Sequence, residues 1–181
     1  VGNIHTEAAR LVTLIDDIIR LSQLDEGGEL PTEPVDLLTV SQEAAETLQD
    51  AAAARQVTVS VQGEPTVIPG VRRLLYEIVY NLCDNAIKYN RDGGRVDITV
   101  AHDADGSSVT VADTGIGIAP EHQARVFERF YRVDKSHSKA SGGTGLGLSI
   151  VKHAMQLHHG RIELESMPGT GTTIRAIFPK A

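Results

Sequence analysis

The chain has 181 residues, of which 41% are hydrophobic and 23% are charged, enough for one domain with its own core. Its 17 Lys and Arg residues against 24 Asp and Glu residues give a formal net charge of −7, and only 4% of its residues are aromatic. An acidic chain with few rings is a poor match for nucleic acid, which needs basic surface and stacking platforms. The single cysteine, Cys83, excludes an internal disulfide, and no apolar run reaches the ~20 residues of a membrane span.

The beginning of the chain predicts a helical arm over residues 1–28. Apolar side chains recur there at near-heptad spacing, and two consecutive glycines end the pattern. The repeating positions are Ile4, Ala8, Leu11, Leu14, Ile15, Ile18, Leu21 and Leu24. Pro31 and Pro34 then favour an extended connection, so we expect a linker over 29–35 and the main domain over 36–181. A helix that packs on that domain is the alternative.

The main domain mixes helical and alternating segments. The helical patterns cover residues 36–55, with Asp36 as N-cap, 71–89, 120–130 and 146–159. The alternating patterns cover residues 57–61, 95–102, 107–113, 161–166 and 172–178, with a hairpin turn at 103–106. Together they predict an α+β fold, a two-layer α/β sandwich in which helices lie on one face of a mixed, mostly antiparallel sheet.

The stretch NLCDNAIKYN, residues 81–90, is unusual because it continues a helical pattern with polar residues. Glu77, Asn81, Asn85 and Lys88 follow one another at helical spacing and form a polar stripe beside the apolar one. Asn is a mediocre helix former, and its amide costs free energy when it is buried without partners. Amide oxygens are hard ligands suited to Mg²⁺, and lysine suits phosphate. A satisfied polar helix face is the plainer alternative.

A second motif, DTGIGI at residues 113–118, directly follows a predicted strand. Gly115 and Gly117 let the backbone turn tightly and approach a ligand. The carboxylate of Asp113 can accept a hydrogen bond from an exocyclic amine such as N6 of adenine. A plain turn would explain the glycines alone.

Two further segments combine glycines with positive charge. Glycines at 142, 143, 145 and 147 lead into the helix expected from Leu146, the arrangement of an anion site at a helix N-terminus. The Lys and Ser/Thr of a Walker loop are absent. Upstream, VFERFYRVDKSHSK clusters Arg129, Arg132 and two lysines in an acidic chain, which suggests contact with a polyphosphate or an acidic partner. A flexible linker and a solvated charged face are the respective alternatives.

In their order and spacing, NLCDNAIKYN, DTGIGI, FERFYR and GGTGLGLSIVKH resemble the N, G1, F and G2 boxes of sensor histidine kinases of two-component systems. That family belongs to a wider superfamily of ATP-binding proteins that includes type II topoisomerases and mismatch-repair ATPases. The resemblance covers residues 36–181, and LIDDIIRLSQLDEGG resembles the last helix of the family's dimerisation and phosphotransfer domain. It implies an ATP-binding catalytic domain with ATP and Mg²⁺ as cofactors.

The resemblance implies a role for each matching residue. Asn85 would be the Mg²⁺ ligand, Asn81 would lie beside the phosphates, and Lys88 would contact them. Asp113 would bind the adenine amine, and Tyr89 would flank the adenine. Gly115, Gly117 and Ile118 would shape the pocket, and Arg129 and Arg132 would approach the phosphates. Thr173 would support a water near the carboxylate. The triphosphate cradle would be formed by Gly143, Thr144, Gly145, Leu146, Gly147 and Leu148.

One part of the family pattern is missing from the sequence. None of the seven histidines fits the phosphoacceptor motif, which is a His followed by an acidic residue and then typically by Leu-Arg-Thr-Pro, so the resemblance implies a fragment that lacks the acceptor histidine. ATP-hydrolysing relatives carry a glutamate base where this chain has Asn81, and an amide cannot take a proton from water. We therefore expect phosphoryl transfer to a histidine on an absent acceptor helix. The alternatives are a hydrolysing ATPase, a nucleotide-sensing module and a serine kinase.

The resemblance also implies partners and a location. The phosphoryl group would pass to an aspartate on the receiver domain of a response regulator. The dimerisation domain of the same kinase would form a homodimer, and nucleic acid is not expected as a partner. The chain would be the cytoplasmic portion of a membrane-anchored bacterial sensor, attached through segments outside this sequence.

Overall fold

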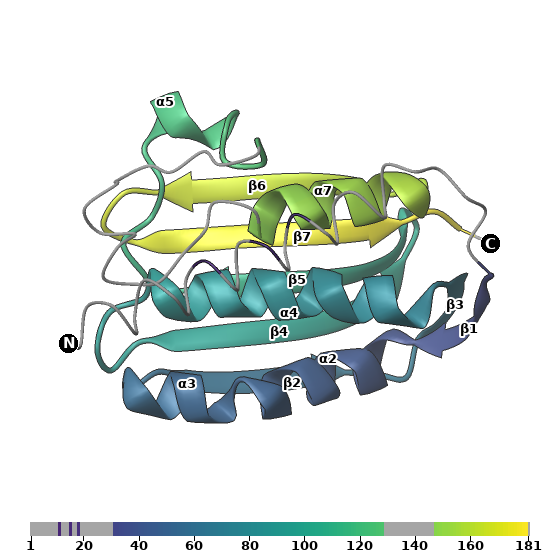
Figure 1. Ribbon diagram of the computed structural model, residues 1–181, viewed down its shortest axis with the longest axis horizontal. Helices are drawn as coiled ribbons and strands as arrows, with labels where there is room; N and C mark the ends of the chain where they lie inside the picture. Colours follow the sequence, from purple (N-terminus) through teal and green to yellow (C-terminus); the bar gives the residue numbers. More distant parts are fainter. Residues whose placement is uncertain (1–10, 12–14, 16–17, 19–30, 129–146, 181) are drawn as a thin grey trace.

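The computed structural model describes residues 31–128 and 147–180, together with Leu11, Ile15 and Ile18. Its main feature is a five-stranded sheet in the order β2-β4-β5-β7-β6 (Figure 1). Only β2 and β4 pair in parallel, and the other neighbours are antiparallel. The strands are β2 (Thr58–Gly63), β4 (Arg95–Asp103), β5 (Gly106–Asp113), β6 (Arg161–Met167) and β7 (Gly171–Phe178). The predicted mixed, mostly antiparallel sheet is confirmed.

The three longest helices lie on one face of this sheet, as Figure 1 shows. They are α2 (Leu37–Thr47), α4 (Arg72–Lys88) and α7 (Gly147–Leu157), while α3 (Gln49–Ala54) continues α2 and the short α5 (Pro120–Gln123) follows β5 along the chain. The core lies between the two layers, where Leu75 and Ile78 of α4 and Ile98 of β4 are completely buried. Each such side chain contributes about 1.5–3 kcal/mol through removal from water. The α+β sandwich expected from the sequence is confirmed.

A second, two-stranded sheet was not expected. The strands β1 (Glu33–Asp36) and β3 (Val67–Gly70) pair antiparallel, with Pro34 opposite Pro69. Proline lacks the N–H that a sheet ladder uses, so neither segment carries a strand signal. Val35, inside the segment expected as a linker, is only 3% exposed. The end of that segment is therefore packed against the domain.

The helix expected over residues 36–55 is divided at Leu48. Its predicted N-cap is confirmed, because the Leu38 N–H donates to Asp36 Oδ1 at 3.1 Å. At Leu48 the backbone leaves helical geometry with φ −92° and ψ 5°, and α3 begins at the next residue. The Leu48 side chain is 3% exposed, so burial of this leucine in the core holds the break in place.

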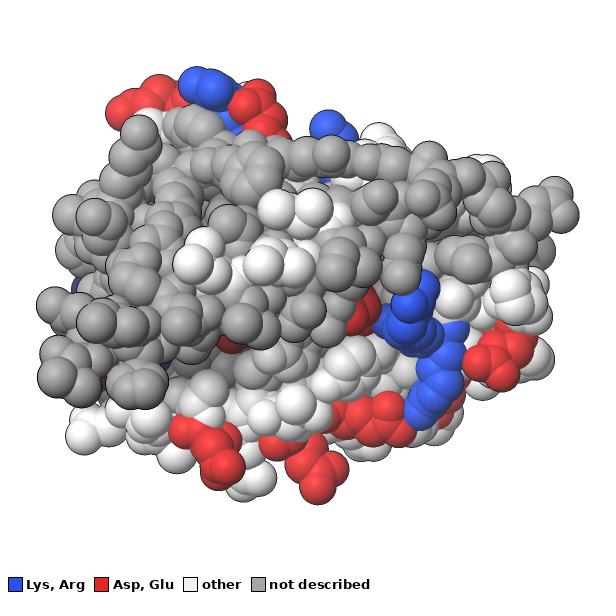
Figure 2. Space-filling model, viewed as in Figure 1, with Lys and Arg blue, Asp and Glu red and all other residues white. Residues whose placement is uncertain are grey.

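Charged side chains follow the edge of the helical layer. Figure 2 shows acidic atoms gathered along α2 and α3, with a group of basic atoms near the start of α4. Arg72 at that start contacts Glu43 of α2, with Nη2 and Oε1 at 2.5 Å. At least one member of this basic group, Arg72, is thus paired with an acidic neighbour. Among the described residues, no helix has both the length and the apolar character that crossing a membrane requires.

Candidate functional site

The polar stripe predicted on α4 is present at the border of the buried face of the helix. Glu77, Asn81, Asn85 and Lys88 are all partly exposed, and Leu82 beside them is 1% exposed. This arrangement follows from the helical period, which places residues four apart on one side. The stripe is therefore accessible to a ligand and is anchored by a helix whose other side is in the core.

Several side chains of the stripe and its flank contact one another. Asn81 Nδ2 donates to the backbone oxygen of Glu77 at 2.7 Å and lies 3.3 Å from its Oε2. Lys88 Nζ pairs with Asp84 Oδ2 at 2.9 Å, one turn away. Asn85, in contrast, makes no side-chain hydrogen bond to residues 31–128 or 147–180. A partly buried amide without a partner in these two ranges suits an oxygen-seeking cation such as Mg²⁺.

The same part of the chain has no other cation site of the usual acidic kind. No group of three His, Cys, Asp or Glu side chains that could hold a metal occurs among the described residues. A divalent ion at the stripe would therefore be held by the amide oxygen of Asn85 together with oxygens of a ligand, which is how Mg²⁺ usually binds with phosphates.

The first turn of α7 lies next to the stripe. A Cβ at Gly147 would lie 3.3 Å from Asn81 Oδ1, so the glycine permits a close approach between the two helices. Leu148 follows with 9% exposure and packs in the core, which fixes the direction of α7. The first turn of a helix leaves backbone N–H groups without intrahelical acceptors. These donors and the stripe therefore lie on neighbouring surfaces.

Asp113 ends β5 with its carboxylate held on one side. Its Oδ1 accepts hydrogen bonds from the N–H of Gly115 at 2.9 Å and the N–H of Thr172 at 3.2 Å. Within the described part of the chain, nothing donates to Oδ2. Burial raises the pKa of Asp113 above its ordinary value, and the two backbone hydrogen bonds act in the opposite direction. The carboxylate is thus oriented by one oxygen and presents the other.

The loop after Asp113 packs so closely that it requires its glycines. A Cβ at Gly115 would collide with the backbone oxygen of Tyr89, and one at Gly117, whose φ is +74°, would collide with that of Met167. The Ile116 N–H donates to Tyr89 O at 3.1 Å, which ties the loop to the end of α4. The carboxylate and the helical stripe are therefore parts of one connected region.

The loop is also tied to β6 and β7 through residues that the sequence did not single out. Ile118 N donates to Ser166 Oγ at 2.7 Å, and Ser166 Oγ contacts Thr172 Oγ1 at 2.8 Å. Gln123 Nε2 bridges the backbone oxygens of Ile118 and Ser166 at 2.9 and 3.2 Å. Ser166 and Gln123 lie in no recognisable sequence motif. The contacts of Ser166 with Ile118 and of Gln123 with Ser166 join residues more than 40 positions apart, so no local pattern signals them.

One expected position shifts by a residue. The register pairs Asp113 with Thr172 and Ala112 with Thr173. Since side chains alternate between the two faces of a strand, Thr173 points to the face opposite Asp113. The threonine beside the carboxylate is therefore Thr172 and not Thr173. The sequence TGTT offers no local signal for this register, which is set by the pairing of β5 with β7.

Some of the expected site residues cannot be placed. The positions that lie outside the described residues are Arg129, Arg132, Gly143, Thr144, Gly145 and Leu146. Their contact with phosphates stays a prediction from the sequence. The structure does bring together the stripe of α4, the start of α7, the carboxylate of Asp113 and the loop that follows it.

Comparisons with known proteins agree with this geometry. The model of the family described as histidine kinase-, DNA gyrase B-, and HSP90-like ATPases matches residues 70–181. That range includes the whole of α4, the Asp113 loop, α7 and the last two strands. The match therefore covers more than half of the chain and all of the site described above.

Curated relatives and solved structures point to one branch of that family. The chain is 41% identical over 177 residues to the sensor-like histidine kinase SenX3 of Mycolicibacterium smegmatis, covering 96% of this chain and 46% of the relative. It is 38% identical over 179 residues to the phosphate regulon sensor protein PhoR of Pseudomonas aeruginosa, covering 97% and 40%. The chain thus spans less than half the length of these relatives.

Two solved structures share the fold. The mycobacterial sensor histidine kinase MprB matches with a TM-score of 0.71 and 30% identity over 81% of this chain and 96% of that one. Full-length ShkA, in complex with AMPPNP, matches with a TM-score of 0.81 and 29% identity over 97% of this chain and 37% of that one. With the matched family, the fold and the site in agreement, the chain belongs to the histidine kinase-, DNA gyrase B-, and HSP90-like ATPases, as a catalytic domain of the sensor histidine kinase type.

Proposed function

We propose that the chain binds Mg·ATP and transfers its γ-phosphoryl group to a histidine on another segment, for relay to an aspartate of a response regulator. The observation that carries this proposal is the carboxylate of Asp113. Its Oδ1 is fixed by two backbone N–H groups, and its Oδ2 has no donor among the described residues. A carboxylate oriented in this way can accept the exocyclic amine of adenine, and guanine has no such amine at that position.

The stripe of α4 would bind the other end of the nucleotide. Asn85 would ligate Mg²⁺ through its amide oxygen, and Lys88 would leave Asp84 to contact the phosphates. The first turn of α7 would supply N–H donors to the same phosphates. When it is bound, Mg²⁺ supplies neutralisation of the phosphate charge. The protein's own contribution is then to position the γ-phosphoryl group and to exclude competing nucleophiles.

The residue at position 81 supports transfer over hydrolysis. By the resemblance to the family, Asn81 would occupy the position at which hydrolysing relatives carry a glutamate, and its amide donates to Glu77. An amide cannot accept a proton from an attacking water, so water would be a poor nucleophile here. The crystal structure of full-length ShkA is a complex with AMPPNP, and this likeness supports nucleotide binding by the present chain.

The first part of the chain supports a dimeric parent protein. Leu11, Ile15 and Ile18 have helical geometry, lie at i, i+4 and i+7, and are 56%, 54% and 44% exposed. Such a stripe would be covered in a dimerisation domain to which residues 1–28 contribute the C-terminal helix. We propose that the parent is a membrane-anchored bacterial sensor whose cytoplasmic portion includes this chain, and that its partner is a receiver domain.

The test combines the chain with γ-labelled ATP, Mg²⁺ and a separate acceptor-helix segment from a sensor histidine kinase. We expect label on the segment that is lost in acid and kept in base, as for phosphohistidine. Acid-stable label would indicate a serine kinase, and steady phosphate release without label would indicate an ATPase. Asp113→Ala is the control, because it should abolish labelling by removing nucleotide binding.

A further inference from the structure

Asn90 closes the stretch NLCDNAIKYN, yet no nucleotide role falls on it. It lies two residues beyond Lys88, the last residue of α4, and is 4% exposed, which is unusual for an asparagine. A buried amide has two donors and an acceptor to satisfy, and each one left without a partner costs free energy. The partners of Asn90 therefore show which parts of the molecule it connects.

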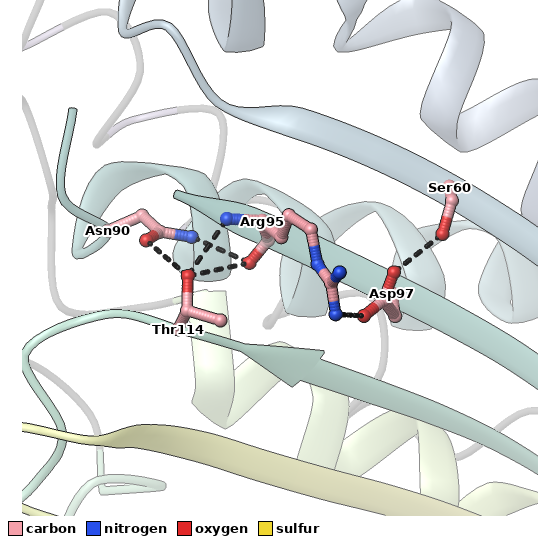
Figure 3. Close-up of polar contacts among 5 residues, drawn as sticks. All are labelled: Ser60, Asn90, Arg95, Asp97 and Thr114. Carbon is pink, nitrogen blue, oxygen red and sulfur yellow. Dashed lines mark hydrogen bonds and ion pairs between the residues drawn. The ribbon is translucent and has the colours of Figure 1, made fainter. Parts of the chain in front are cut away.

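Asn90 joins three segments that meet at the nucleotide end of the sheet (Figure 3). Its Nδ2 donates to Arg95 O at the start of β4, at 2.9 Å. Its Oδ1 accepts from the Arg91 N–H at 2.8 Å and lies 3.4 Å from Thr114 Oγ1. Thr114 Oγ1 also accepts from the Arg95 N–H at 2.9 Å. One amide thus connects the end of α4, the first residue of β4 and the residue that follows Asp113.

The surroundings of Asn90 are shaped around this amide. A Cβ at Gly94 would collide with Asn90 Oδ1, so the turn between α4 and β4 needs a glycine there. A Cβ at Gly115 would lie 3.1 Å from the Asn90 Cα. Gly115 is also the residue whose N–H holds Asp113 Oδ1 at 2.9 Å. The position of that N–H therefore depends on how Thr114 and Gly115 are seated against Tyr89 and Asn90.

We propose that Asn90 is a positioning residue for adenine recognition, acting through Thr114 and Gly115 on the orientation of the Asp113 carboxylate. The proposal rests on the proposed function, since it assigns Asn90 to one end of the same nucleotide site. Asn90 does not contact the nucleotide in this mechanism. It keeps the Gly115 N–H directed at Asp113 Oδ1, so that Oδ2 remains in place for the exocyclic amine.

The outer part of the same network provides a matched control. Arg95 Nη2 pairs with Asp97 Oδ2 at 3.1 Å, and Ser60 Oγ donates to Asp97 Oδ1 at 2.6 Å, on the side away from Thr114 (Figure 3). These contacts bind β2 to β4 and do not reach the Asp113 loop. Asp97→Asn therefore disturbs the outer part of the network and leaves the carboxylate of Asp113 undisturbed.

The first readout needs no nucleotide. We expect Asn90→Ala to raise the hydrogen-exchange rate of the Gly115 amide by about tenfold, the loss of roughly one hydrogen bond, while the Ile98 amide in the core of the sheet keeps its rate. Asp97→Asn should leave Gly115 unchanged. An unchanged Gly115 rate in Asn90→Ala, or an equal rise at Ile98, would overturn the proposal.

The second readout separates adenine from phosphate. In Asn90→Ala we expect the affinity for Mg·ATP to fall about tenfold, while the affinity for Mg·tripolyphosphate stays the same. Equal losses for both probes would indicate a general structural role and would overturn the proposal. Asn90→Asp keeps the acceptor for Arg91 and replaces the donor to Arg95 O by a carboxylate, so it should weaken ATP binding as well.

Two provisions keep the outcome decisive. If Asn90→Ala does not fold, Thr114→Val tests the same link at an exposed residue, with the same direction and a smaller effect on both readouts. If the wild-type chain does not bind Mg·ATP, the proposed function fails. The Gly115 exchange rate then still decides whether Asn90 orients the Asp113 loop.

Discussion

The two ends of the site are built in different ways. At the Asp113 end, backbone N–H groups from Gly115 and Thr172 hold the carboxylate, and the loop cannot accept a Cβ at Gly115. On α4, Lys88 is paired with Asp84, a partner that it would have to leave, and Asn85 makes no side-chain hydrogen bond to the described residues. The proposed base-recognition end is held by backbone and is therefore pre-organised, whereas the proposed cation and phosphate end would have to rearrange when a ligand arrives.

The largest effect is expected at the pre-organised end. Asp113→Asn keeps an oxygen for the Gly115 and Thr172 donors but turns the second oxygen into an N–H₂ that opposes the adenine amine. We expect ATP affinity to fall by about a hundredfold, as for loss of a hydrogen bond to a charged group. Calorimetric titration with an ATP analogue measures this.

Stability should change in the opposite direction in the same variant. Burial raises the pKa of Asp113, which means that the ionised carboxylate lowers the stability of the folded state. This loss of stability is present at neutral pH and disappears as pH falls through the raised pKa. Asp113→Asn should therefore unfold at a higher temperature than the wild type at pH 7. A marked loss of stability would mean that the charge of the carboxylate supports the fold instead of the ligand.

A comparison of two glycines sharpens the contrast between the ends. Gly115→Ala would place a methyl group against Tyr89 O, a backbone atom. This variant should lose about 1–3 kcal/mol of stability, and its ATP binding should be weakened as well. Gly147→Ala meets Asn81 Oδ1, a side-chain atom at 3.3 Å that can move. It should cost little, because alanine also favours helix. Thermal unfolding of both variants checks this, and equal losses would contradict a difference in rigidity.

A smaller effect is expected from the ion pair on α4. Lys88 and Asp84 are 29% and 23% exposed, and an i, i+4 pair of this kind contributes about 0.3–0.5 kcal/mol. Asp84→Asn should leave stability nearly unchanged and raise the affinity for Mg·ATP a few-fold, because Lys88 no longer has to leave a partner. Weaker ATP binding in this variant would show that Asp84 itself takes part in binding the ligand.

The smallest effect on nucleotide affinity is expected at the far end of α4, where α7 also ends. His158 Nε2 accepts from the Val71 N–H at 3.1 Å, and its Nδ1 lies 2.7 Å from Ala154 O, so the ring is held neutral. Burial lowers the pKa of His158 below its ordinary 6.5. The hydrogen bond to Ala154 O acts in the opposite direction, and the neighbouring His159 lowers the pKa a little further. The stability that this ring contributes is therefore present above about pH 6.5 and is lost as pH falls from there towards the lowered pKa.

The measurement is the free energy of unfolding between pH 8 and pH 5. His158→Gln should show a shallower decline than the wild type, with a difference of about 1 kcal/mol, the usual contribution of one hydrogen bond. Nucleotide affinity at neutral pH should be similar in both proteins. Identical slopes would show that His158 does not join the two helices in solution.

Local patterns in the sequence were sufficient for the parts of the site that lie within one element. The stripe of α4 follows from helical spacing, and the loop after Asp113 follows from two glycines at the end of a strand. The pairing of β1 with β3, the choice of Thr172 over Thr173 and the contacts of Ser166 depend on strands distant in the sequence. No single segment contains that information, and the prolines in β1 and β3 even argue against it.

The measurement that tests the two-ended site most directly is titration of wild type, Asp113→Ala and Asn85→Ala with an ATP analogue, at saturating Mg²⁺ and in EDTA. We predict that wild type binds more tightly with Mg²⁺, that Asn85→Ala binds equally under both conditions, and that Asp113→Ala binds under neither. Full magnesium dependence in Asn85→Ala, or wild-type affinity in Asp113→Ala, would contradict the division of the site into a cation end on α4 and an adenine end at Asp113.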